Sequence, residues 1–182
     1  MTLPAGFAEV APSNLPRDTV YRLAEGTASR IGYGPSNLSN LPSLVERELG
    51  GRVVKKNFWL LDDYGSIQIR GEADFTIFLP DDATPERDRF TIAHELGHYV
   101  LHYVWPVRMM NQSLGPTCAS RYDSNRAEWE ANWFAAAFLM PQQPFEAAWR
   151  AASGNRVADV ARRFGVSRRA AEIRARALGL GD

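Results

Sequence analysis

Apolar residues recur three or four positions apart in the first part of the chain, at Val20, Leu23, Ala24, Ala28 and Ile31. This period predicts a helix from Asp18 onwards, because such positions share one helical face. Residues 1–16 contain three prolines and predict an irregular lead-in. The stretch 33–40 is rich in Gly, Pro, Ser and Asn and predicts a loop, and a short helix over 44–49 should end at the two glycines behind it.

The hydrophobic period then changes to that of a strand. Residues 53–61 are rich in β-branched and aromatic side chains, and apolar and polar residues alternate over 66–70 and 74–79. The breaks between these segments, 62–65 and 71–73, have the length of hairpin turns. The pattern predicts a small three-stranded antiparallel sheet, and the edge of its second hairpin could accept a bound peptide as an added strand.

The rest of the chain is predicted to be helical. Thr84 can cap a helix that begins at Pro85, and Pro106 should block this helix soon after Tyr103. A long loop is expected over 106–124.

A second long helix over 126–140 and two or three shorter helices complete the prediction. The fold class is therefore α+β with a helical C-terminal half. We expect three regions: a lead-in and helix over 1–35, a catalytic domain over 36–150, and a helical hairpin over 151–182 that packs on it.

Composition adds few constraints. The 182 residues carry 21 basic and 21 acidic side chains, so net charge favours neither a nucleic acid nor a membrane as partner. Cys118 is the sole cysteine, which excludes an internal disulfide and fits a reducing compartment. The sequence has no signal-peptide pattern and no apolar run of membrane-spanning length, so we expect a cytoplasmic protein.

The strongest chemical signal is the sequence HELGH at 94–98, within the first long predicted helix. His94 and His98 are four positions apart, so both imidazoles can reach one zinc ion. Glu95 can then act as the general base for a water molecule that the metal acidifies. His102 is four residues further on, but a straight helix places it about 12 Å from His94 along the axis, so we interpret it as a neighbour of the site.

A catalytic zinc ion requires a third protein ligand. The second long helix offers two candidates, Glu128 and Glu130. Glu128 is favoured because it shares a face with Asn132, which could then hold a ligand histidine from behind. Glu130 is interpreted as a solvated carboxylate in the first helical turn.

Several of these motifs together resemble the ImmA/IrrE family of metallopeptidases. The resemblance rests on RFTIAHELGH (89–98), EWEANWFA (128–135), LMP (139–141), ARRFGVS (161–167) and RARALGL (174–180). It implies a gluzincin-like, zincin-like fold with a small sheet beside the metal-bearing helix. It also implies His94, His98 and Glu128 as zinc ligands and Glu95 as the catalytic base.

The resemblance further implies a protein substrate. Members of this family typically cleave a repressor of the helix-turn-helix type and thereby derepress genes. We therefore expect a zinc endopeptidase with a protein partner, and no direct contact with nucleic acid.

The C-terminal segment supports an alternative function. Residues 150–182 contain eight arginines and three acids, and they predict a helix, a turn and a second helix. Arg168, Arg169, Arg174 and Arg176 could face phosphate groups. The alternative is a DNA-binding or protein-binding regulator with a structural metal site. The presence of Glu95 argues against this alternative, because a structural metal site does not need a general base.

Overall fold

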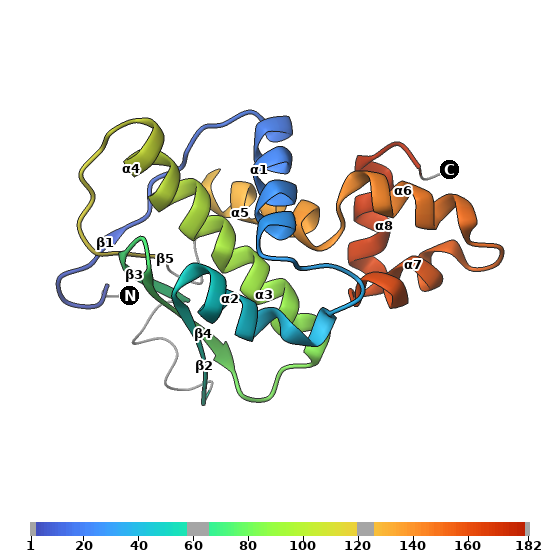
Figure 1. Ribbon diagram of the computed structural model, residues 1–182, viewed down its shortest axis with the longest axis horizontal. Helices are drawn as coiled ribbons and strands as arrows, with labels where there is room; N and C mark the ends of the chain where they lie inside the picture. Colours follow the sequence, from blue (N-terminus) through green and yellow to red (C-terminus); the bar gives the residue numbers. More distant parts are fainter. Residues whose placement is uncertain (1–2, 58–65, 120–125, 181–182) are drawn as a thin grey trace.

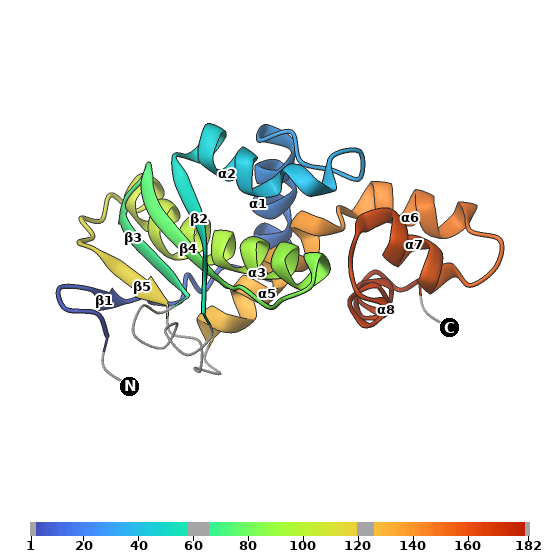
Figure 2. The same ribbon diagram turned by 90° about the horizontal axis from the view of Figure 1, so that it is seen from below.

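The computed structural model describes residues 3–57, 66–119 and 126–180. In this part of the chain, one mixed sheet lies against a group of helices, and three further helices follow at the C-terminal end (Figures 1 and 2). The sheet has the strand order β1-β5-β3-β4-β2. Its strands are β1 (Ala8–Glu9), β2 (Gly51–Lys56), β3 (Ile67–Gly71), β4 (Asp74–Pro80) and β5 (Thr117–Ala119). The predicted α+β class is confirmed.

The predicted three-stranded antiparallel meander is wrong. Only β3 and β4 form the expected antiparallel hairpin, because β2 pairs with β4 in the parallel direction. Alternation along a strand determines which side chains face the core but leaves the neighbouring strand open. The predicted turn at 62–65 lies outside the described residues.

The β3–β4 hairpin also has no free edge for an added peptide strand in the described part of the sheet. β4 is covered by β2, and β3 is covered by β5 in an antiparallel pair. The outer strands of the sheet are β1 and β2.

The first two helices match the hydrophobic pattern. They are α1 (Arg17–Arg30) and α2 (Leu41–Leu49), and a short 3-10 turn, η1 (Leu38–Asn40), precedes the second. Gly50 ends α2 in the left-handed region with φ of 71°, where a residue without Cβ is favoured. α1 lies against the long helix α5 (Arg126–Leu139).

The helix that carries HELGH is longer than predicted. α3 (Pro85–Gly97) continues into a π-helical segment, η3 (His98–Val104), and then into α4 (Trp105–Met109), as Figure 1 shows. Thr84 caps its start by accepting a hydrogen bond from the backbone N–H of Arg87. Pro106 does not stop the helix, because it lies in the first turn after the π segment, where the hydrogen-bond register changes.

The predicted loop at 106–124 is also partly wrong, because it contains β5. This strand lies between β1 and β3 and pairs with both. Cys118 belongs to this strand, and its side chain is buried against the rest of the protein. Residues 120–124 lie outside the described residues.

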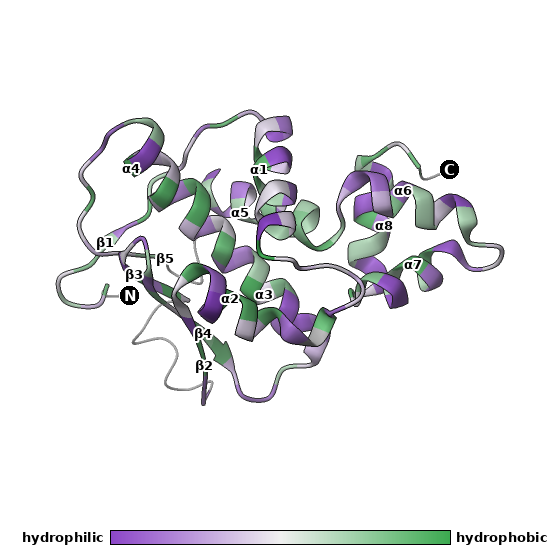
Figure 3. Cartoon of the chain, viewed as in Figure 1, coloured by the Kyte–Doolittle hydropathy of each residue, from purple (hydrophilic) through white to green (hydrophobic). Residues whose placement is uncertain are grey.

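Three helices complete the described chain: α6 (Gln142–Ala151), α7 (Arg156–Phe164) and α8 (Arg168–Ala177). The rings of Phe145 and Phe164 pack 5.5 Å apart between α6 and α7. Hydrophilic and hydrophobic positions alternate around these helices, as expected when one face is buried (Figure 3). None of the described helices has both the length and the apolar character that crossing a membrane requires.

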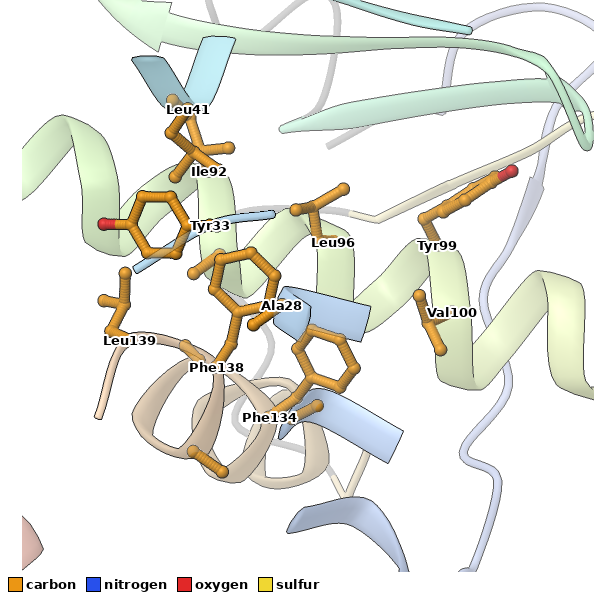
Figure 4. Close-up of a cluster of buried hydrophobic side chains, with 14 of the residues drawn as sticks. Ala28, Tyr33, Leu41, Ile92, Leu96, Tyr99, Val100, Phe134, Phe138 and Leu139 are labelled. Carbon is orange, nitrogen blue, oxygen red and sulfur yellow. The ribbon is translucent and has the colours of Figure 1, made fainter. Parts of the chain in front are cut away.

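The core that supports the HELGH helix lies between α1, α3 and α5. Figure 4 shows Leu96 from α3 near Phe134 and Phe138 from α5, with Ala28 of α1 and Tyr33 beside them. All five side chains are buried. This packing holds α3 and α5 side by side, so their polar faces meet at one place.

Candidate metal centre

The close approach of α3 and α5 depends on Gly97. A Cβ atom at this position would lie 2.9 Å from Ala131 Cα, 3.2 Å from Ala131 O and 3.2 Å from Phe134 Cβ. Glycine therefore occurs inside this helix because α5 passes directly over its backbone. As a result, Glu128, one turn before Ala131, reaches the histidines of α3.

Three predicted ligand residues meet at this crossing. His94 Nε2 lies 3.1 Å from Glu128 Oε2, and His98 Nε2 lies 3.0 Å from Glu128 Oε1. The two Nε2 atoms are 3.1 Å from each other. His94, His98 and Glu128 thus form a group whose ligand atoms all lie within 4.8 Å of one another.

The donor atoms fit a tetrahedral zinc ion. Ligand atoms about 2.0–2.1 Å from such an ion are about 3.3 Å apart, because tetrahedral bonds meet at about 109°. The two Nε2 atoms are 3.1 Å apart, close to this value, and each of them lies 3.0–3.1 Å from a different oxygen of Glu128. Two imidazoles and one carboxylate are also a donor set of catalytic zinc sites.

The charges of the group favour cation binding. Burial raises the pKa of Glu128, but hydrogen bonds from His94 and His98 outweigh it and lower that pKa to about 2. Burial lowers the pKa of His98 to about 3, so its ring is neutral near pH 7. For His94, burial acts in the same downward direction, but Glu128 and the charge of Glu95 raise the pKa overall. An anionic Glu128 and a neutral His98 are the protonation states that a metal requires, whereas at His94 the metal must compete with the proton that the raised pKa favours.

Glu95 lies beside these residues and opens onto the same pocket. The pocket has a volume of about 260 Å³ and is lined by Ser66, Phe90, Thr91, His94, Glu95, Glu128 and Asn132. The side chain of Glu95 is 3% exposed, and its Oε2 accepts a hydrogen bond of 2.9 Å from Ser66 Oγ. Ser66 stands directly before β3 and was not singled out by the sequence, where an isolated serine carries no signal.

Asn132 lies beside the ring of His94. Its Oδ1 is 3.2 Å from His94 Nδ1, the ring nitrogen that faces away from Glu128. An acceptor there favours the tautomer with a proton on Nδ1 and a lone pair on Nε2. Asn132 is thus placed to orient one of the two histidines.

The interpretation of Glu130 as a solvated carboxylate is wrong. Glu130 is fully buried, and its Oε2 lies 3.0 Å from Nε2 of the buried His102. Arg126 and Ser13 donate further hydrogen bonds to its two oxygens. Its alignment with Phe134 on α5 was the available sign of burial, but the partner Ser13 is too far away in the sequence to be inferred.

Comparisons with known proteins identify the family. No curated protein matches the chain. A family model for peptidase M78, described as the IrrE N-terminal-like domain, matches residues 63–176, which is more than half of the sequence. The chain belongs to this family. The match includes both long helices, α3 and α5, and confirms the resemblance on which the sequence interpretation rested.

A solved structure shows the same fold as this M78 family member. It is a Mycobacterium tuberculosis transcriptional regulator, with a TM-score of 0.57 and 20% sequence identity. The alignment covers 89% of this chain and 47% of the regulator, so the chain spans about half the length of that protein.

In this family member, Cys118 could act as a metal ligand, and Tyr64, Tyr103 and Tyr122 carry hydroxyls that could donate to an oxyanion. Cys118 is buried in β5, and Tyr103 is buried on η3 outside the residues that line the pocket. Tyr64 and Tyr122 belong to undescribed segments. Arg174 could face phosphate only under the alternative DNA-binding interpretation, but it is 1% exposed and donates from Nε to Met140 O at 2.9 Å, so it is not available for that role.

Proposed function

We propose that this chain is a zinc-dependent endopeptidase that cleaves a protein partner. The observation that carries the proposal is the convergence of two imidazoles and a carboxylate, at zinc-ligand separations, beside a buried glutamate on an open pocket. Membership of a peptidase family supports it. Under this proposal, His94, His98 and Glu128 are the ligands.

Under this proposal, several residues around the pocket have their own roles in the reaction. Zinc, when bound, supplies a Lewis acid that acidifies water and polarises a carbonyl group. Glu95 accepts the proton of the attacking water and delivers it to the leaving amine. Ser66 holds the Glu95 carboxylate in place, and the hydrogen bond between Asn132 and the ring of His94 orients that ligand.

The proposed substrate is a helix-turn-helix transcriptional repressor whose cleavage derepresses genes. This choice follows the family resemblance. The regulatory setting also agrees with the description of the structurally similar mycobacterial protein as a transcriptional regulator. The proposed partner is therefore a protein, and the proposed location is the cytoplasm.

The function is tested by incubating the protein with a repressor encoded next to its gene. We expect cleavage with zinc, none with a chelator, and a loss of at least about 100-fold for Glu95→Gln, the scale of general-base catalysis. Glu95→Gln should retain zinc, because Glu95 is outside the ligand group. Equal cleavage by this variant would contradict the proposed mechanism.

Zinc content tests the third ligand separately. Glu128→Ala should purify without stoichiometric zinc, because its carboxylate lies within 3.1 Å of both ring nitrogens. Glu130→Ala should retain the ion, with weaker affinity. Retention by the first variant and loss by the second would exchange the roles of the two glutamates.

A regulator that binds DNA through the C-terminal helices is the second candidate. It is favoured by Arg168, Arg169 and Arg176, which are exposed on α8 after a helix-turn-helix-like connection. A gel shift with duplex DNA tests it, since replacing Arg168 and Arg169 should reduce the salt dependence of binding. The buried Glu95 beside the ligand group argues against this candidate, because a structural metal site needs no general base.

A further inference from the structure

We propose that His102 and Glu130 are positioning residues, which set the tautomer of His98 and aim its lone pair at the metal. The segment around Ser13 holds this pair in place. The inference deepens the proposed function, because it describes how the same metal centre is supported. It rests on a continuous line of hydrogen bonds that joins η3, α5 and the irregular N-terminal segment.

The line begins at the ligand and runs into the core. His98 Nδ1 lies 3.1 Å from His102 Nδ1, and His102 Nε2 lies 3.0 Å from Glu130 Oε2. The side chains of His98, His102 and Glu130 are each no more than 2% exposed. Buried polar groups of this kind must satisfy one another, since water cannot replace a missing partner.

Glu130 determines which atoms donate and which accept along this line of hydrogen bonds. Its Oε2 accepts hydrogen bonds of 2.8 Å from both the backbone N–H and the hydroxyl of Ser13. Its Oε1 accepts one of 2.9 Å from Arg126 Nε. A carboxylate surrounded by donors can only accept, so His102 must donate from Nε2.

The next hydrogen bond in the line joins His102 to the proposed metal ligand His98. A His98 ring that binds zinc through Nε2 keeps its proton on Nδ1 and donates from there, so the facing Nδ1 of His102, 3.1 Å away, must accept. The lone pair of His98 is then on Nε2, the atom that lies 3.0 Å from Glu128 Oε1. Glu130 thus selects, through two rings, the tautomer of His98 that can bind zinc.

The N-terminal segment holds Glu130 and Arg126 in place through hydrogen bonds. Besides the two bonds from Ser13, Arg126 donates from a second nitrogen to Leu15 O at 3.1 Å. Ser13 and Leu15 lie before the region that matches the family model, residues 63–176. A part of the chain outside the family match therefore contacts the support of the metal centre.

Nitrogen NMR of the histidine rings tests the inference directly. In the whole protein loaded with zinc, His98 should carry its proton on Nδ1 and His102 should carry its proton on Nε2. In Glu130→Gln the selection should weaken, because the amide can turn its NH₂ group toward His102. A proton on Nδ1 of His102 in the zinc-loaded wild-type protein would overturn the proposal.

Zinc affinity, measured by competition with a chromophoric chelator, provides a second readout. His102→Leu removes the acceptor, and zinc binding should weaken about 10- to 100-fold, the range for lost outer partners of metal ligands. His102→Asn places an amide oxygen at the same δ1 position and should restore most of the affinity. Wild-type affinity in both variants would overturn the proposal, and so would equal losses in both.

Two serine-to-alanine variants test the role of the N-terminal segment. Ser13→Ala removes one of the bonds to Glu130 and should weaken zinc binding by less than about tenfold, whereas the exposed Ser29 can be replaced by alanine without effect. Equal affinities for Ser13→Ala and wild type would remove Ser13 from the proposal. These readouts are independent of peptide cleavage. A protein with the stated tautomers that cuts no repressor would keep this inference and refute the proposed substrate.

Discussion

Replacing Gly97 with alanine should damage the metal centre without touching any of its residues. The added Cβ would lie 2.9 Å from Ala131 Cα on α5. Carbon atoms in contact are about 3.5–4.0 Å apart. The two helices must therefore separate locally by about 0.6–1.1 Å to accept the methyl group.

This displacement exceeds what a zinc site tolerates. Metal–ligand distances in proteins hold to about 0.2 Å, and Glu128 is carried by the part of α5 that must move. The change in folding stability should be smaller. Alanine is favoured over glycine in a helix by about 1 kcal/mol, whereas overpacking a core costs about 1–3 kcal/mol. We expect a net loss of about 0–2 kcal/mol in the free energy of unfolding.

The measurements are zinc affinity by chelator competition and metal-free stability by urea unfolding. Gly97→Ala should bind zinc at least about tenfold more weakly than wild type. Gly26→Ala is the matched control, because Gly26 is exposed within α1 and a Cβ there would meet nothing within 4 Å. It should keep full affinity and gain up to about 1 kcal/mol. Unchanged zinc binding in Gly97→Ala would refute the role given to this close approach.

Three further predictions concern single side chains. Ser66→Ala should lower kcat about tenfold with zinc content unchanged, because Glu95 loses a hydrogen bond worth about 1.5–3 kcal/mol; an unchanged kcat would contradict this role. Arg174→Ala should destabilise the protein by about 2–4 kcal/mol in urea unfolding, because its buried guanidinium binds Met140 O and Glu25. The exposed Arg176→Ala is the control and should stay within about 0.5 kcal/mol of wild type. Burial raises the pKa of Glu130, but its hydrogen bonds outweigh burial and hold the folded-state pKa at about 2. Its contribution to stability is therefore present above its ordinary value near 4.5 and is lost as pH falls toward 2. The stability difference between wild type and Glu130→Gln should shrink over that pH range, and a constant difference would contradict the assignment.

The helical half of the chain was predictable because its signals are local. Caps, prolines and apolar spacing act within a few residues, so α1 begins close to its expected start and α5 lies close to its expected bounds. The misjudged end of the HELGH helix has a tertiary cause. The buried π segment η3 packs His102 toward Glu130, and Pro106 then falls in a first helical turn.

The sheet was less predictable because strand pairing joins distant segments. No local pattern in residues 51–56 indicates that they pair in parallel with β4. The short strands β1 and β5 also lack a clear alternation of apolar and polar residues. Such strands are stabilised by their partners in the sheet, so their existence depends on the assembled fold.

For the metal centre, the sequence by itself determined the residues that could do the chemistry. Spacing on one helix face brings His94 and His98 together, because an α-helix returns after about 3.6 residues. Only the tertiary structure decided that Glu128 lies within 3.1 Å of both rings and that Glu130 contacts His102 behind them. Those choices depend on how closely α5 crosses α3 at Gly97 and on Ser13 reaching Glu130 from the N-terminal segment. Both are contacts between segments far apart in the chain, and local spacing carries no information about them.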